Sequence, residues 1–187
     1  MRTAVEHNNV PIVSFLISNG LDTWHMYSNS AINHKARDVL SYFLSIGWQI
    51  NDTSRLNNHP GILGWVVQDE EMLVWLIDHG ANPNQPCQVD MTPTSIAVEE
   101  APLSTLQLLF KRGANINKGE LFHHAVERKS DEIAFIDYLL EKGANINKTR
   151  YDNDPHSMRF LGLFTGLRTP LHKAAKKRKA SCSASSA

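Results

Sequence analysis

A five-residue segment recurs along the chain, and its spacing constrains the fold more than any other feature of the sequence. Residues 80–84 read Gly-Ala-Asn-Pro-Asn, and residues 113–117 and 143–147 both read Gly-Ala-Asn-Ile-Asn. A degenerate copy starts at Gly47, and a trace of one starts at Gly20. The five Gly residues are separated by 27, 33, 33 and 30 residues (47−20, 80−47, 113−80, 143−113). Self-similarity with a period near 33 predicts stacked structural repeats.

Each copy follows two short segments with helical spacing, which we call the first and second helices of a repeat. The second helix of the first repeat carries Ile12, Phe15 and Leu16 on one face, the i, i+3, i+4 pattern of a buried stripe. The first helices centre on small residues that precede the closing Gly by 16, 16, 16, 16 and 18 residues: Ala4, Ala31, Gly64, Ala97 and Ala125. A Gly past the last helical turn can adopt the left-handed conformation that closes a helix. The pattern therefore predicts an all-α chain whose second helices end at these glycines.

A sixth unit identifies the type of repeat. Residues 169–175 read Thr-Pro-Leu-His-Lys-Ala-Ala, and Thr92, Pro93 and Ala97 match this opening in part. With the Gly-Ala-Asn-Ile-Asn closing turn, the chain resembles the ankyrin repeat family over about residues 4–175. The resemblance implies an ankyrin-repeat solenoid, in which helix-turn-helix units stack and short hairpin fingers join them. It also implies that the His of the opening is structural and bonds neighbouring backbone, a position held by His172 and His123.

The spacing predicts one ankyrin repeat domain over residues 1–175. It would comprise five repeats and a truncated sixth, at about 1–22, 23–51, 52–84, 85–117, 118–147 and 169–179. A finger is missing near Trp24, and residues 148–168 form an insertion about 14 residues longer than a regular finger. The apolar cluster at 160–164 favours an insertion that folds back over an exposed repeat face; a partner contact site is the alternative. Residues 180–187 lack apolar periodicity, which predicts a disordered tail.

Composition and motifs exclude several classes of protein. The sequence contains no Gly-x-Ser-x-Gly motif and no P-loop, and its nine His residues are dispersed over different repeats and turns. Cys87 and Cys182 are too far apart to suggest a disulfide framework or a zinc site. We therefore expect no catalytic residues, no cofactor, no metal and no small-molecule substrate.

Charge and hydropathy bear on location and partners. Residues 1–90 carry 4 Lys/Arg and 9 Asp/Glu (net −5), and residues 91–187 carry 15 and 10 (net +5). No run of 18 apolar residues occurs, so we expect no membrane insertion. We expect an intracellular, cytoplasmic protein, with nuclear import as an alternative because residues 176–179 read Lys-Lys-Arg-Lys. We do not expect a nucleic acid partner.

The resemblance implies a non-catalytic scaffold that binds another protein through the concave face of the repeat stack. In ankyrin repeat proteins, partners dock on the fingers and on outward positions of the first helices. The matching finger residues here are Asp52, Ser54, Arg55, Gln85, Gln88 and Asp90. The matching first-helix residues are Val66, Val67, Glu99, Glu100, Glu127 and Arg128. The alternative is a regulatory or targeting segment of a larger multidomain ankyrin-repeat protein, with the activity elsewhere.

Overall fold

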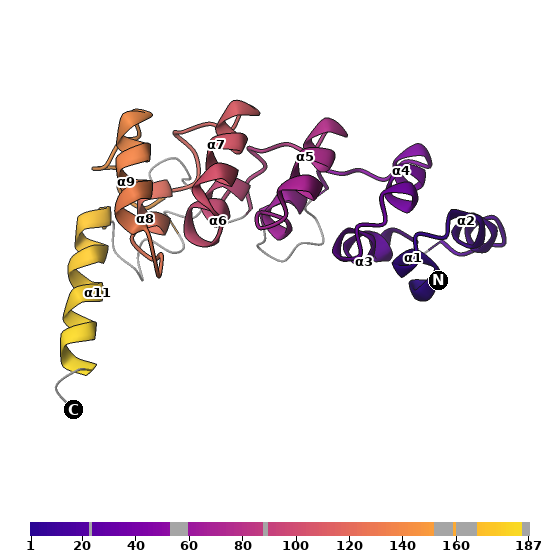
Figure 1. Cartoon of the computed structure of the whole chain (residues 1–187), viewed down its shortest axis with the longest axis horizontal. Coiled ribbons are helices and arrows are strands. Elements are labelled where there is room, and N and C mark those ends of the chain that lie inside the picture. The colour runs from indigo at the N-terminus through magenta and orange to yellow at the C-terminus, as the bar shows by residue number, and fades with distance from the viewer. Residues whose placement is uncertain (23, 53–59, 88–89, 152–158, 160–167, 185–187) are drawn as a thin grey trace. The chain divides into compact units, whose positions relative to one another are not determined.

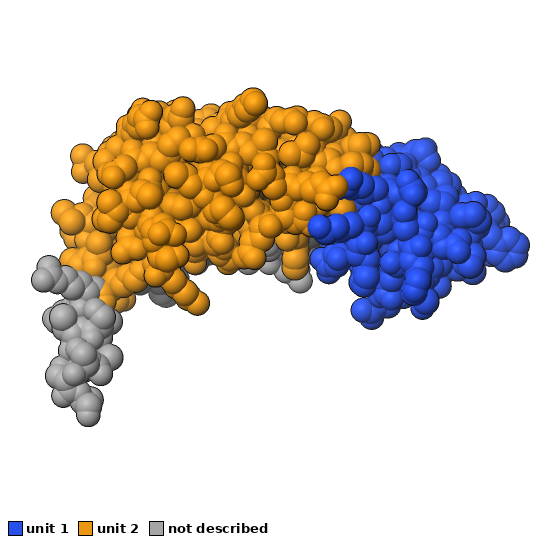
Figure 2. Space-filling model, in the orientation of Figure 1, with its two compact units in different colours: residues 1–50 blue, residues 51–187 orange. Residues whose placement is uncertain are grey.

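All regular secondary structure is helical in the part of the chain that the computed structural model describes. That part is residues 1–187 without 23, 53–59, 88–89, 152–158, 160–167 and 185–187. The predicted all-α class is confirmed for these residues. The chain divides into two compact units, residues 1–50 and 51–187 (Figure 2), whereas the sequence predicted one domain over residues 1–175.

The first unit contains two helical pairs. Its elements are α1 (Arg2–Glu6), α2 (Val10–Ser18), the 3-10 helix η1 (Trp24–Tyr27), α3 (Ser28–Asn33) and α4 (Arg37–Ser45) (Figure 1). Because η1 leads directly into α3, no finger projects between the first two repeats among the described residues. Asn8 links the pairs, since its Oδ1 accepts from the Val39 amide at 3.0 Å and its Nδ2 donates to Asp38 Oδ2 at 2.7 Å. Asn8 thereby satisfies a backbone donor in the first turn of α4.

The second unit contains further helical pairs. Its elements are the 3-10 helix η2 (Ile62–Trp65), α5 (Glu70–Asp78), α6 (Pro93–Glu100), α7 (Leu103–Lys111), α8 (Leu121–Ala125), α9 (Glu132–Glu141) and α11 (Pro170–Ala184) (Figure 1). Helix α8 contacts α6, α9 and α11, so first helices of successive repeats are neighbours. A buried core joins them, made of Val98, Leu106, Leu121, Phe122, Ala125, Phe135 and Leu139.

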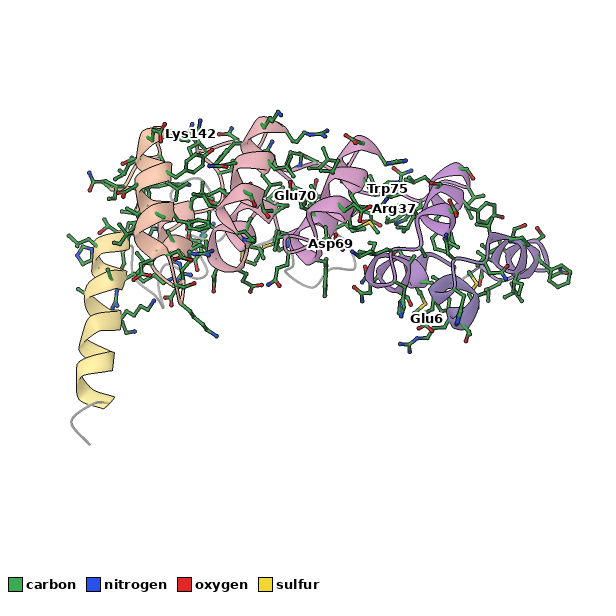
Figure 3. All side chains as sticks on the ribbon, viewed as in Figure 1. Glu6, Arg37, Asp69, Glu70, Trp75 and Lys142 are labelled. Carbon is green, nitrogen blue, oxygen red and sulfur yellow. The ribbon has the colours of Figure 1, made fainter. Side chains whose placement is uncertain are left out.

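Local sequence explains which first helices form fully. Thr92 caps α6 in a capping box with Ser95, and Pro93 pre-sets the first turn. The corresponding element of the third repeat is only the 3-10 helix η2, which contains Gly64 and follows Gly61. Glycine disfavours an α-helix because it loses more backbone entropy on folding than any other residue. The second helix of that repeat, α5, is capped by Asp69, which accepts from the Met72 amide at 3.2 Å (Figure 3).

The five predicted helix-ending glycines adopt one conformation. Their φ angles lie between 82° and 102°, at Gly20, Gly47, Gly80, Gly113 and Gly143. In each case the Gly amide donates to the carbonyl three residues earlier and the next amide to the carbonyl five residues earlier, as for Gly80 to Ile77 and Ala81 to Leu76 at 3.0 Å. This is the Schellman motif. The prediction that these glycines end the second helices is confirmed.

The C-terminal helix is longer than the sequence predicted. Residues 180–187 were expected to be a disordered tail, but α11 continues to Ala184. No Gly or Pro interrupts residues 171–184, and Ala, Lys and Arg are strong helix formers. These propensities explain the extension, while residues 185–187 lie outside the described part.

Candidate binding surface

Charged side chains connect the first helices of the second unit. His124 Nδ1 donates to Glu99 Oε2 at 2.7 Å, and Lys173 Nζ donates to Glu127 Oε1 at 3.1 Å. The hydrogen bond from His124 lowers the pKa of the Glu99 carboxyl. Glu100 is exposed at the end of α6. We call Glu99, Glu100, His124, Glu127 and Lys173 the first-helix surface. Glu99 and Glu127 thus lie where the sequence placed them, but each also holds two repeats together.

One side-chain bond recurs at the same repeat position. Ser95 Oγ donates to the Gly119 carbonyl, and His123, at the corresponding position one repeat later, donates from Nε2 to the Arg168 carbonyl at 2.7 Å. The predicted structural role of His123 is confirmed by this bond to backbone. Burial lowers the pKa of His123 to about 4, so the imidazole is neutral at pH 7. His172 instead pairs through Nδ1 with Thr169 Oγ1 at 2.7 Å.

Basic side chains cap the first helices from the following repeat. Arg128 Nη1 donates to the carbonyls of Val98 and Ala101 at 2.7 and 3.0 Å, at the end of α6. Lys177 Nζ donates to the carbonyls of Val126 and Arg128 at 2.7 and 2.9 Å, just past the end of α8. Both cations stand three residues after the small residue on which their first helix centres. Helix α11 therefore engages α8 through the same contact that the fifth repeat makes with the fourth.

Three residues expected to face outward are buried, which corrects the prediction for Val66, Val67 and Arg128. Their exposed fractions are 6%, 2% and 8%. Arg128 lies over the Phe135 ring at 3.7 Å, and burial lowers the pKa of its guanidinium. Val66 and Val67 follow η2, whose three residues per turn change the direction of the side chains relative to an α-helix. The resemblance assumed an α-helix at this position.

The predicted finger residues fall into three groups. Asp52 is exposed, and Gln85 is partly buried. Asp90 is also partly buried, and Lys148 Nζ lies 3.6 Å from its Oδ2. Ser54, Arg55 and Gln88 lie outside the described residues. Asp52 and Glu100 are therefore the predicted contact residues that the described part exposes most clearly.

A buried carboxylate that sequence reasoning missed holds the start of the insertion. Glu120 is 4% exposed and accepts from the Tyr151 amide and from Arg150 Nε at 3.2 Å. Burial raises the pKa of Glu120, and the hydrogen bonds from Tyr151 and Arg150 act in the opposite direction. The Arg150 amide also donates to the Arg168 carbonyl at 3.3 Å, so the insertion begins and ends at one point. Glu120 occupies the position of Thr92, and nothing local marks a carboxylate there as buried.

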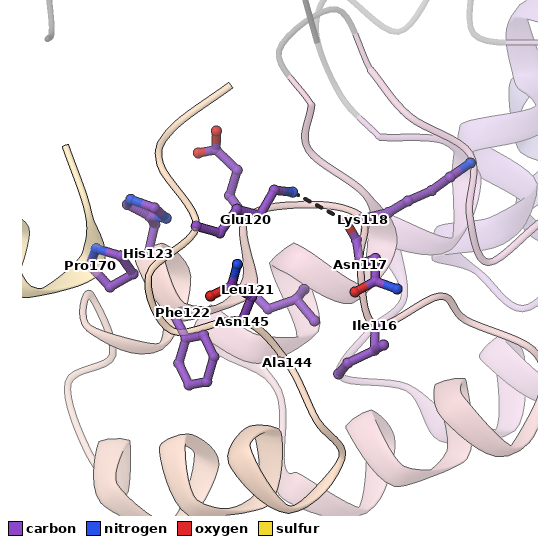
Figure 4. Close-up of a pocket in the computed structure, with 11 residues that line it drawn as sticks. Ile116, Asn117, Lys118, Glu120, Leu121, Phe122, His123, Ala144, Asn145 and Pro170 are labelled. Carbon is purple, nitrogen blue, oxygen red and sulfur yellow. Dashed lines mark hydrogen bonds between the residues drawn. The ribbon is translucent and has the colours of Figure 1, made fainter. Parts of the chain in front are cut away.

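A recess lies between the closing turns of the fourth and fifth repeats, α8 and the start of α11 (Figure 4). Its lining includes Glu120, His123 and Lys148, whose polar atoms bond other groups of the protein. Lys148 Nζ donates to the Asn117 carbonyl at 3.1 Å, which Figure 4 marks with a dashed line. These polar groups serve to join successive turns, so the recess is a structural junction.

Searches for other kinds of site gave no candidates in the part of the chain that the structure describes. No three His, Cys, Asp or Glu side chains there converge on a point where a metal ion could bind. None of the helices within the described ranges combines the length and apolar character needed to cross a bilayer. No protein-family model matches the chain.

Proposed function

We propose that the chain is an ankyrin-repeat solenoid that acts as a non-catalytic scaffold and binds a partner protein through its first helices and fingers. One observation carries this proposal: successive closing turns are joined by the same pair of bonds. Asn51 donates to the Gly80 carbonyl and accepts from the Asn82 amide, both at 2.8 Å. Asn84 donates to the Gly113 carbonyl at 2.8 Å and accepts from the Asn115 amide at 2.7 Å.

A backbone pinned in this way is suited to recognition. Within the turns, Asn82 Oδ1 accepts from the Asn84 amide, and Asn115 Oδ1 accepts from the Asn117 amide, both at 2.9 Å. Side chains held on a rigid backbone lose little conformational entropy on binding. The exposed carboxylates Asp52 and Glu100 favour a partner that presents basic side chains, because complementary potentials steer association.

Charge reversal with matched controls tests the proposal. The test variant combines Asp52→Lys and Glu100→Lys, and the control variant combines Glu70→Lys and Asp137→Lys, exposed positions on the second helices α5 and α9. Each tagged variant is used for affinity capture from the native lysate, and the captured proteins are quantified by mass spectrometry. We expect the test variant to reduce recovery of the dominant partner at least about tenfold, a difference of roughly 1.4 kcal/mol. The control variant should recover it like the unmodified chain.

Circular dichroism melting of both variants accompanies the capture, since a folding defect would also reduce recovery. Equal recovery by the test variant and the unmodified chain would contradict the proposal. Glu99 is left unchanged in this design because its bond to His124 also contributes to the packing of α6 and α8.

A further inference from the structure

Three apolar side chains at the end of the fifth repeat are exposed where the equivalent side chains of the fourth repeat are covered. Ile133, Leu140 and Ile146 are 65%, 44% and 43% exposed. Counted from the closing glycines at 143 and 113, they correspond to Leu103, Phe110 and Ile116, which pack against the core that α8 and α9 share with the fourth repeat. The exposed set therefore occupies positions that a following second helix covers.

The sixth repeat points to the same vacant position from its own side. Leu171 of α11 is 77% exposed, although its equivalent in the fifth repeat, Phe122, is 4% exposed and packs in the core with Phe135 and Leu139 of α9. Phe122 is thus covered by the second helix of its own repeat. No second helix accompanies α11 among the described residues.

The direction of α11 indicates that the chain does not supply this helix itself. Glu100, the last residue of α6, corresponds to Lys177. Helix α11 continues seven residues past Lys177 to Ala184 (184−177), which carries the chain roughly 10 Å onward instead of turning it back. The occupant of the vacant position therefore comes from elsewhere.

Charge specifies the occupant further. Asp78 stands two residues before its closing Gly and pairs with Arg112, which stands one residue before the closing Gly of the next repeat. Glu141 holds the position of Asp78 in the fifth repeat and is exposed. An occupant that continues the stack would place a basic residue at the end of its helix, opposite Glu141.

We propose that α9 and α11 form a docking site for an amphipathic helix of a partner protein, with an apolar stripe spaced as in α9 and a basic C-terminal end. The described helices of this chain do not offer that combination. Helix α2 exposes Ile12 and Phe15 but has no basic residue in its last turn, and α7 ends in Lys111 but buries Leu106 and Leu109. The site is distinct from the first-helix surface and does not depend on it.

A helix-stapled, fluorescein-labelled peptide that copies residues 131–147 is a suitable probe. It carries Phe135 and Leu139 on its apolar face and Lys142 at the position of Arg112; Figure 3 labels Lys142 at the end of α9. Fluorescence polarisation with the full chain should show saturable binding. Ile133→Asp with Leu140→Asp should weaken it at least about tenfold because burying a charge against the apolar stripe is unfavourable.

Two controls separate this docking from nonspecific adhesion. Phe15→Asp changes an equally apolar, 66% exposed side chain on α2 and should leave peptide binding unchanged. Glu141→Lys should weaken binding about two- to fivefold, the usual range for an exposed ion pair, and Lys142→Glu in the peptide should restore it.

Several results would overturn the proposal. One is the absence of saturable binding to a chain that circular dichroism shows to be folded, and another is an equal loss caused by Phe15→Asp. Concentration-dependent dimerisation abolished by Ile133→Asp with Leu140→Asp would identify a second copy as the occupant. Binding that appears only after Phe160, Leu161 and Phe164 are changed to Ser would identify the chain's own insertion.

Discussion

At the scale of single residues, the buried imidazole of His123 makes stability depend on pH. Its pKa of about 4 in the folded chain lies below the ordinary value of 6.5, so between these values the unfolded chain binds the proton and the folded chain does not. Stability therefore falls as pH drops through this window, by about 2 kcal/mol from pH 7 to pH 5. Urea unfolding of the unmodified chain and of His123→Gln at both pH values measures this. The variant should lose that part of the pH dependence; the same slope in both would contradict the account.

Gly119 is a second residue whose role can be tested. Its φ is +82°, and an added Cβ would meet Ser95 Oγ and Thr92 Oγ1. Gly143 has the same φ, but its Cβ would meet nothing within 4 Å. We expect Gly119→Ala to lower the free energy of unfolding by about 2–4 kcal/mol and Gly143→Ala by about 1–2 kcal/mol. Equal losses in chemical denaturation would show that the contact with Ser95 and Thr92 is unimportant.

Residue roles were predictable where they depend on local backbone geometry. The left-handed glycines follow from sequence because any Cβ is penalised at such a helix end, and His123 followed from its place in the opening motif. The burial of Glu120 and Arg128 was not predictable, because it depends on partners about 30 residues away, at Tyr151 and Val98. A charged residue has the same local signature whether it faces solvent or a neighbouring helix end.

At the scale of elements, Arg128 and Lys177 allow the cost of capping a first helix from the next repeat to be measured. Arg128→Met removes two charged hydrogen bonds and leaves the carbonyls of Val98 and Ala101 without this donor, so we expect a loss of about 2–3 kcal/mol. Lys177 is exposed, so Lys177→Met should cost less than about 1 kcal/mol. Thermal and urea unfolding compare the two. A larger loss for Lys177→Met would contradict the equivalence in kind and difference in burial.

Element type followed the sequence wherever caps and propensity agreed, as in α6 with Thr92 and Pro93. It departed where they did not: the third repeat contains Gly61 and Gly64 and forms only η2, which also misplaced Val66 and Val67. Helix α11 shows the opposite error, because absent apolar periodicity was taken as disorder although residues 171–184 contain no helix breaker.

At the scale of the whole molecule, the asparagine bridges couple one repeat to the next. Asn84→Ala removes the bonds to both Gly113 and Asn115, and Asn84→Asp removes only the donor to the Gly113 carbonyl. We expect losses of about 1–2 kcal/mol for Ala and about half of that for Asp. Hydrogen exchange should quicken at residues 113–117 in the same order. Unchanged exchange in Asn84→Ala would show that the bridge does not couple the turns.

The number of compact units was not predictable from the repeat pattern. Period and turn chemistry are similar on both sides of residue 50, yet the chain divides there into residues 1–50 and 51–187. Such a boundary depends on the packing between neighbouring repeats, which a pattern of single-repeat features does not encode. The choice of partner lies at the same scale and depends on which charges remain exposed after packing.

Site-specific photo-crosslinking tests the central claim, that a partner protein docks on the first helices, most directly. A photoreactive phenylalanine analogue is placed at position 100 in one variant and at position 137, on the second helix α9, in the other. Both tagged chains are irradiated in native lysate after their fold is checked by circular dichroism. The account predicts one dominant crosslinked protein from position 100 and none from position 137. No crosslinked protein from position 100, or the same protein from both positions, would contradict it.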